Sequence, residues 1–201
     1  MKWFQRTPVD AARWVVVDCE TSGLDIARDR LLSVGAVAVR EGRVELADAF
    51  EARVRQDRPS APENIVIHGI GGDAQVLQGR ELDLVVREFT GYLDDGVPVA
   101  FHAAFDAGIL RRHGVKPRAP WLDLAGLAPA LYPALGRKDS SLDHWLAAFG
   151  IPAQARHDAL GDAFATAQLL LVLLNEAKRQ RLDTVEALMK TERAGRWLAR
   201  R

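Results

Sequence analysis

Two carboxylates stand two residues apart directly after an apolar segment. Asp18 and Glu20 follow Trp14–Val17 in the run WVVVDCE. The β-branched residues predict a strand, and side chains at positions i and i+2 of a strand point to the same face. Two adjacent carboxylates raise each other's pKa unless a cation neutralises them. A solvated strand end is the simpler interpretation of this pair when it is taken alone. A functional interpretation needs further acids elsewhere in the chain.

Two further acids occupy positions where a helix would turn them toward the protein interior. Asp106 shares a helical face with Leu110, and Asp162 shares one with Leu169, because residues four or seven apart lie on one side of a helix. The helix dipole also favours an acid near a helix N-terminus, which is the simpler interpretation of Asp106. A buried lone carboxylate such as Asp162 costs several kcal/mol unless it is paired or bound to a metal. Four acids in three segments, all directed at one sheet, favour a metal site.

The four acids form an all-oxygen ligand set without cysteine. Such a set suits hard cations and predicts Mg²⁺ or Mn²⁺. Two such ions about 3.5–4 Å apart can activate a water and stabilise the leaving oxygen of a phosphodiester. His157, five residues before Asp162, could take the proton of that water, because a neutral imidazole titrates near physiological pH. A surface histidine beside an N-capping Asp158 is the alternative for His157.

Hydrophobic periodicity predicts the elements that must position these residues. Apolar, β-branched runs predict strands at 14–17, 31–39, 44–54, 97–101 and 121–124. Helical spacing predicts helices at 81–93, 104–113, 141–149, 159–179 and 184–198, and loops are expected at 56–63 and 69–73. Three strands in a row, with a turn at Glu41 and Gly42, form a plausible antiparallel meander. The strands that follow alternate with helices, which predicts one mixed α/β sheet.

The composition is that of an ordinary globular domain. The 201 residues carry 27 Lys+Arg and 27 Asp+Glu, and 48% are hydrophobic, which excludes collagen-like and disordered classes. Cys19 is the only cysteine, so an internal disulfide is excluded and a reducing, cytoplasmic location is expected. On a strand, Cys19 would point away from Asp18 toward the core. The longest apolar run, Leu169–Leu174, is too short for a membrane span, and the N-terminus lacks the apolar segment of a signal peptide.

The zero net charge divides unevenly along the chain. Residues 178–201 carry eight basic and three acidic side chains, a net charge of +5, which leaves −5 on residues 1–177. We therefore predict a main domain at 10–178 and a basic helical appendage at 179–201 that packs on or beside it. The appendage suits a phosphate backbone, and a solvated helix face is the simpler alternative.

Three ordered motifs carry a resemblance to a known enzyme family. VVDCETSGL at 16–24 resembles the first motif of the DEDD 3′–5′ exonucleases, FHAAFD at 101–106 the second, and HDALGD at 157–162 the third. The H-x-A-x-x-D form of the third motif is that of the DEDDh branch, which includes epsilon-like proofreading and RNase T-like exonucleases. The match runs over roughly residues 14–175 and includes IHGI, DLAGLAPALYP and SLDHWLAAFGI.

The resemblance implies a metal-dependent 3′–5′ exonuclease that hydrolyses single-stranded nucleic acid, DNA favoured, to nucleoside 5′-monophosphates. It implies a ribonuclease H-like α/β fold, in which an antiparallel meander and two parallel strands form a five-stranded mixed sheet flanked by helices. The metal ligands would be Asp18, Glu20, Asp106 and Asp162, which hold two Mg²⁺ ions bridged by Asp18. Mn²⁺ would substitute for Mg²⁺. His157 would be the general base that deprotonates the attacking water.

The resemblance also implies substrate contacts around the first two motifs. The Thr21 backbone would contact the terminal 3′-OH, and Leu24 would wedge against the last base. The remaining substrate-binding positions are Ser22, Gly23, His102 and Phe105. The second motif of epsilon-like proteins usually reads H-N-x-x-F-D, so His102 stands where asparagine is usual. Both side chains donate a hydrogen bond, and the ligand position Asp106 is unchanged.

Two alternatives stay open at this point. An RNA-directed exoribonuclease or oligoribonuclease would use the same chemistry and would differ in its tolerance of the 2′-OH. A non-catalytic module that binds nucleic acid or a polymerase predicts a damaged acid set, whereas all five positions are filled here. The expected partners are 3′ ends of single-stranded DNA or RNA, with a DNA polymerase or a second copy of the chain as further candidates, and no membrane. The absence of a long C-terminal tail favours action without a tether.

Overall fold

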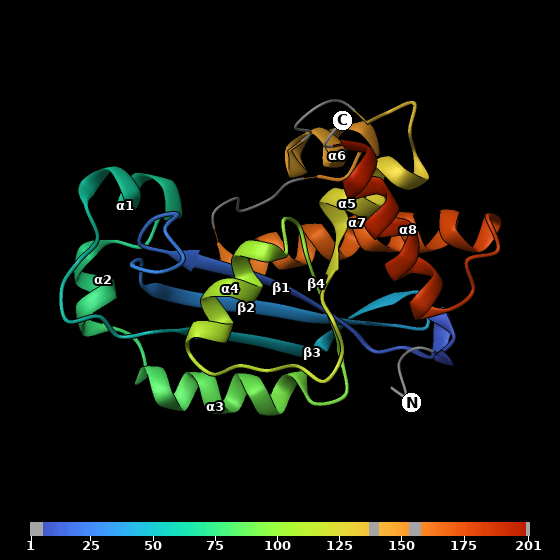
Figure 1. Ribbon diagram of the computed structural model, residues 1–201. Coiled ribbons are helices and arrows are strands. Elements are labelled where there is room, and N and C mark those ends of the chain that lie inside the picture. The colour runs from blue at the N-terminus through green and yellow to red at the C-terminus, as the bar shows by residue number, and fades with distance from the viewer. Residues whose placement is uncertain (1–5, 137–140, 153–157, 200–201) are drawn as a thin grey trace.

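A five-stranded mixed sheet forms the centre of the protein, as the computed structural model shows for residues 6–136, 141–152 and 158–199 (Figure 1). The strands lie in the order β3-β2-β1-β4-β5. Their bounds are β1 (Trp14–Thr21), β2 (Leu31–Arg40), β3 (Arg43–Arg53), β4 (Val97–Ala100) and β5 (Leu122–Asp123). β1, β2 and β3 pair antiparallel, whereas β4 pairs parallel to β1 and β5 parallel to β4. The predicted meander followed by two parallel strands is confirmed.

Helices cover both faces of the sheet (Figure 1). Their bounds are α1 (Pro62–His68), α2 (Gly72–Leu77), α3 (Leu82–Leu93), α4 (Ala104–Arg112), α5 (Leu124–Leu131), α6 (Leu142–Ala148), α7 (Ala159–Arg179) and α8 (Val185–Ala199). Alternation along β1 divides the core: Val15 and Val17 pack with residues of α3 and α4 on one face, and Trp14 and Val16 pack with α5 to α8 on the other. Because both faces are covered, β2 is an almost uninterrupted apolar run rather than an alternating one.

The expected loops at 56–63 and 69–73 were partly wrong, because each runs into a short helix. α1 begins at Pro62, and proline suits the first helical turn because its missing N–H is not needed there. Gly69 ends α1 in the left-handed conformation, with φ of 67°. α2 begins immediately afterwards at Gly72. Segments of six or seven residues are too short for a clear helical period, which hid both from the sequence.

The strand expected at 121–124 is shorter than predicted, and the helix that follows it was missed. β5 holds only Leu122 and Asp123, because Asp123 caps α5 by accepting the Ala125 N–H at 3.0 Å. α5 is apolar around most of its circumference and contains Pro129. Such a segment shows no amphipathic period, and an internal proline argues against a helix.

The β2–β3 hairpin turns where the sequence predicts. Glu41 and Gly42 both adopt positive φ, 50° and 72°, as the two central residues of a tight hairpin turn require. Further along the pair, the register shifts between Val37 and Ala38, so that β3 carries extra residues there. One of them, the partly exposed Asp48, accepts hydrogen bonds from Nε of the buried Arg13 at 2.9 Å and from its Nη2 at 2.7 Å.

The basic C-terminal segment packs on the rest of the protein through α8. α8 lies against α5, where Gly195 and Gly126 allow the two backbones to approach closely. The N-terminal residues join it, since Val185 N–H donates to the Thr7 carbonyl at 3.1 Å and Val9 N–H to Asp183 at 3.0 Å. The boundary between residues 178 and 179 stays a prediction.

Among the described helices, α7 alone is long and apolar enough to cross a membrane by length and composition. It is also the central helix of the core, where Ala163, Leu169 and Leu173 are fully buried against the sheet and neighbouring helices. Its apolar character is therefore accounted for by packing within the protein.

Candidate active site

Three of the four predicted acids meet at the end of β1. Asp18 and Glu20 come from β1 and Asp162 from the first turn of α7, and each offers a carboxylate oxygen that lies within 4.8 Å of the other two. Asp162 is 5% exposed, whereas Asp18 and Glu20 are half-buried. The i, i+2 spacing on β1 directs its two acids to the α7 face of the sheet. The three-acid group is thus closed on the protein side and open toward solvent.

Gly35 of β2 is what lets α7 approach these acids. Gly35 pairs with Asp18 across the β1–β2 ladder. A Cβ built on Gly35 would lie 2.2 Å from the Ala159 carbonyl carbon and 2.2 Å from the Leu160 nitrogen. Only a residue without a side chain fits there, so the start of α7 rests directly on the β2 backbone.

The first turn of α7 is fixed by its own cap. The Asp158 carboxylate accepts the Gly161 N–H at 3.0 Å, as the N-cap interpretation of Asp158 predicts. The Asp158 carbonyl accepts the Asp162 N–H at 2.8 Å. These bonds start the helix so that Asp162 faces the sheet one turn later.

Asp106 lies apart from the three-acid group and contacts Cys19. β4 pairs with β1 only as far as Val16, so the β1 backbone beyond that point has no strand beside it on the β4 side. Burial raises the pKa of Asp106 to about 7, and polar interactions of the carboxylate with its own backbone and with the Cys19 thiol and backbone oppose the rise. A nearby divalent cation would hold this carboxylate in its charged form at lower pH.

Cys19 is a buried core residue, as expected from its place between the two β1 acids. Burial raises the pKa of its thiol well above the ordinary value, and the charges of Asp106, Asp18 and Glu20 raise it further. The thiol therefore stays protonated at neutral pH, which excludes it as a nucleophile.

The donor set of the three-acid group fits a hard divalent cation. Three carboxylates within 4.8 Å of one another repel unless positive charge offsets them, and all-oxygen ligands suit Mg²⁺ or Mn²⁺. A small hollow of about 130 Å³ lies beside Glu20 and is lined also by Ser33, Arg53 and Asp158. The site therefore has both the ligands and adjacent open space.

The loop after β1 carries the predicted substrate contacts. Leu24 is 86% exposed at its tip. The Thr21 hydroxyl donates to the Gly23 carbonyl at 2.6 Å. Ser22 is buried, and its hydroxyl donates to Asp29 at 2.9 Å and accepts the Arg30 N–H at 2.9 Å. The Ser22 side chain and Gly23 thus serve the shape of the loop, since a Cβ on Gly23 would collide with Asp29 at 2.5 Å.

His102 stands in a left-handed turn between β4 and α4. Its φ is 62°, a conformation in which asparagine, aspartate and histidine are enriched among residues other than glycine. Its N–H donates to Asp123 at 3.0 Å, and its exposed ring meets the edge of Phe101 at 4.8 Å between centroids. The backbone therefore explains why histidine can replace the usual asparagine. Phe105, the second residue of α4, is half-buried against the α3–α4 core.

His157 lies outside the described residues. The predicted general base therefore stays a prediction, although the helix that follows it begins at Ala159 with Asp158 as N-cap.

Two residues that shape the site were missed by the sequence reasoning. Gly35 interrupts the apolar run LLSVGAVAV, and a glycine inside a strand signals close approach of another backbone. Asp123 caps α5 and also accepts the His102 N–H. Its signal was an acid directly after the apolar pair WL, the same arrangement that drew attention to Asp18.

The comparisons with known proteins agree with this geometry. A family model described as Exonuclease matches residues 15–170. A DNA polymerase III subunit epsilon-like protein from Rhodobacter capsulatus is 34% identical over 189 residues, covering 91% of this chain and 27% of the relative. The chain thus spans about a quarter of that curated relative.

Solved structures share the fold. Exonuclease X, in complex with 5′ overhanging duplex DNA, superposes with a TM-score of 0.70 at 24% identity, covering 89% of this chain and 99% of that one. Escherichia coli exonuclease I, in complex with a dT13 oligonucleotide, gives a TM-score of 0.70 at 19% identity, covering 84% of this chain and 42% of that one. With a family model over most of its length and a relative above 30% identity, this chain belongs to the Exonuclease family.

Proposed function

We propose that this chain is a metal-dependent 3′–5′ exonuclease that hydrolyses single-stranded nucleic acid, preferably DNA, to nucleoside 5′-monophosphates. The observation that carries the proposal is the meeting of Asp18, Glu20 and Asp162 within 4.8 Å at the open end of β1. Membership of the Exonuclease family supports the same chemistry.

In this proposal Asp18, Glu20 and Asp162 would hold a divalent cation. Asp106 lies apart from them beside Cys19, and its role as a fourth ligand rests on its place in the second motif. A divalent cation at such a site would lower the pKa of a bound water and neutralise charge on the phosphodiester. His157 would remove the proton from the attacking water, and the Thr21 backbone and Leu24 would hold the terminal nucleotide in line. His102 would donate to a phosphate oxygen.

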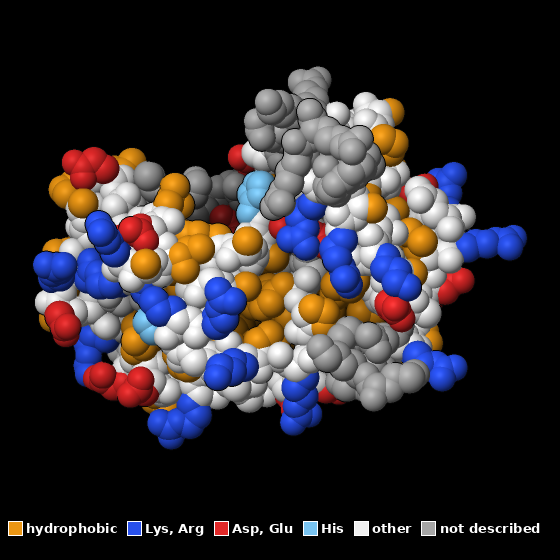
Figure 2. Space-filling view, in the orientation of Figure 1, with side chains coloured by type: hydrophobic (Ala, Val, Ile, Leu, Met, Phe, Trp, Pro, Cys, Tyr) orange, Lys and Arg blue, Asp and Glu red, His pale blue; other side chains and the backbone are white. Residues whose placement is uncertain are grey.

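One observation favours DNA as the substrate, and a second supports binding of either nucleic acid. A relative that is 34% identical is named a DNA polymerase III subunit epsilon-like protein, and two solved structures of similar fold are complexes with DNA. Lys and Arg side chains are spread over the α4 side of the molecule, the face seen in Figure 2. Positive charge there would attract a phosphate backbone and offset the acids of the site.

The decisive experiment uses 5′-labelled single strands of DNA and RNA with matched sequence, incubated with Mg²⁺. Stepwise shortening from the 3′ end is expected, faster on DNA. Asp18→Ala should abolish it, whereas Asp10→Ala, an exposed acid paired with Lys178 near the opposite end of β1, should not. Faster loss of RNA would identify an exoribonuclease, and activity undiminished in Asp18→Ala would reject the site.

The general base is tested separately. His157→Ala should lower turnover far more than it lowers the affinity for Mn²⁺ measured by calorimetry. A collapse of metal binding in this variant would reject the role. Association with a DNA polymerase or with a second copy of the chain stays a prediction. Light scattering on the purified chain measures its molar mass and so tests for a second copy.

A further inference from the structure

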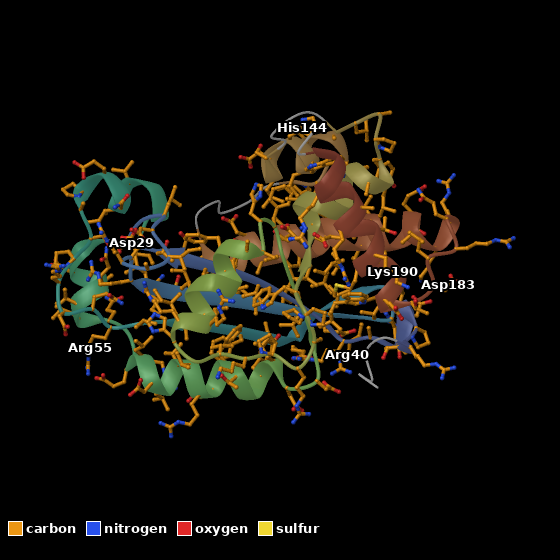
Figure 3. All side chains as sticks on the ribbon, in the orientation of Figure 1. Asp29, Arg40, Arg55, His144, Asp183 and Lys190 are labelled. Atoms are coloured by element: carbon orange, nitrogen blue, oxygen red, sulfur yellow. The ribbon has the colours of Figure 1, made fainter. Side chains whose placement is uncertain are left out.

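The loop that carries Leu24 is bound directly to α4. Arg112, in the last turn of α4, donates from Nη1 to the Ile26 carbonyl at 2.5 Å and from Nη2 to the Asp29 carbonyl. One guanidinium thus joins two points of the loop, which its planar fork of donors allows and a lysine ammonium does not. Figure 3 shows Asp29 on this loop, at the end of the sheet near α1.

A notch in α4 receives the same loop. Gly108 is buried, and a Cβ built there would lie 2.9 Å from Ile26 Cδ1 and 3.0 Å from Ile26 Cγ2. The Ile26 side chain therefore fills the space that the missing Cβ leaves. The loop is therefore held at two positions one turn apart on α4, by the hydrogen bonds of Arg112 and by the contact of Ile26 with Gly108.

The opposite side of the loop is held by α1 and the segment before it. Arg30 donates to the carbonyls of Arg58 at 2.5 Å and Pro59 at 3.1 Å. Asn64 donates from its side chain to the Ser22 carbonyl at 2.5 Å. The loop is therefore fixed on both sides. Leu24, which is 86% exposed, stands at the tip of a loop that is held in one position.

α4 carries both this anchor and the acid Asp106. Arg112 follows Asp106 by six positions, about 9 Å along a helix axis. A rigid helix therefore sets the distance between the acid beside β1 and the loop that presents Leu24.

We propose that Arg112 is a positioning residue for the exonuclease reaction: it holds the Leu24 loop on α4, with Ile26 in the Gly108 notch, so that Leu24 meets the last base at a fixed place relative to the acids. The inference rests on the proposed function and adds to it a residue that acts through the Leu24 loop. It predicts that Arg112 matters for substrates with a terminal base and not for hydrolysis of a phosphodiester without one.

The experiment compares two substrates in wild type and variants: a single-stranded oligodeoxynucleotide, and bis(p-nitrophenyl) phosphate, which has no base. Arg112→Ala and Arg112→Lys should both lower kcat/KM on the oligonucleotide by about tenfold, because a displaced contact costs that much or more. Both should retain hydrolysis of bis(p-nitrophenyl) phosphate. Arg111→Ala removes the same charge from the neighbouring exposed position and is the matched control.

A double-mutant cycle then tests whether Arg112 acts through Leu24. Combining Arg112→Ala with Leu24→Ala should add little to the loss in Leu24→Ala alone, since coupled residues are non-additive. Additive losses, equal losses on both substrates, or an Arg112→Lys variant that behaves as wild type would each overturn the inference. If wild type hydrolyses neither substrate, the proposed function itself fails, which is a different result.

Discussion

Gly35 of β2 and Ala159 of α7 touch backbone to backbone, with only 2.2 Å between the Ala159 carbonyl carbon and the place where a Cβ on Gly35 would lie. This contact sets the depth at which α7 meets the sheet. It therefore sets where Asp162 lies relative to Asp18, the ladder partner of Gly35.

Gly35→Ala should cost about 3 kcal/mol of unfolding free energy, because a methyl group there overlaps backbone that cannot move alone. Activity should fall even at temperatures where the variant is folded, since α7 and Asp162 must shift outward. Chemical denaturation and an exonuclease assay measure the two effects. Gly91→Ala in α3 is the control: nothing lies within 4 Å of its added Cβ, so it should be neutral or gain up to about 1 kcal/mol in helix propensity. Wild-type stability in Gly35→Ala would contradict the close approach.

Asp162→Asn should greatly reduce stabilisation by Mg²⁺. Wild type should gain about 2.7 kcal/mol at a Mg²⁺ concentration one hundred times its Kd, which raises Tm by several degrees in a protein of this size. The variant should gain far less, because the buried member of the three-acid group no longer offers a charged ligand. Differential scanning calorimetry with and without Mg²⁺ measures the difference. An equal rise in both proteins would place the cation elsewhere.

Glu192 should make the protein less stable as pH rises. It is 1% exposed, and burial raises its pKa from 4.5 to about 7, with Arg196 opposing the rise. Because the folded state keeps the proton longer than the unfolded state, the Glu192 contribution is full below pH 4.5 and is lost as pH rises through about 7. Glu192→Gln should therefore gain on the order of 2 kcal/mol relative to wild type between pH 5 and pH 8.

Urea denaturation at the two pH values checks this. Glu186→Gln is the control, because it removes a carboxylate from an exposed pair with Lys190 on the same helix, and such pairs contribute little. If the unfolding free energy of Glu192→Gln instead falls relative to that of wild type as pH rises, Glu192 is charged in the folded protein.

His102 should be replaceable by residues that accept positive φ. His102→Asn should keep the unfolding free energy within about 0.5 kcal/mol of wild type, whereas His102→Val should cost about 1–2 kcal/mol, because a β-branched residue is strained at φ of 62°. On the proposed function, His102→Asn should also keep kcat/KM within about threefold. A larger loss at unchanged stability would assign a role to the imidazole ring that an amide cannot fill.

Much of the site could be predicted because its determinants are local. The spacing of Asp18 and Glu20 within one strand fixes a common face, and the Asp158 cap fixes the start of α7 relative to Asp162. The short helices α1 and α2 and the all-apolar α5 could not be predicted, since their formation depends on packing rather than on a period in the sequence.

The order of the five strands and of the longer helices, the three motifs and the identities of the acids follow from the sequence, because strand alternation, capping and spacing act over a few residues. Folding of distant segments onto one another decided that three acids meet while Asp106 lies beside Cys19 on the other side of β1. It also decided how Gly35 admits α7 and how Arg112 holds the Leu24 loop. These relationships join residues far apart in the chain. Their geometry depends on how closely two segments can pack, which the missing Cβ of Gly35 and the hydrogen bonds of Arg112 determine.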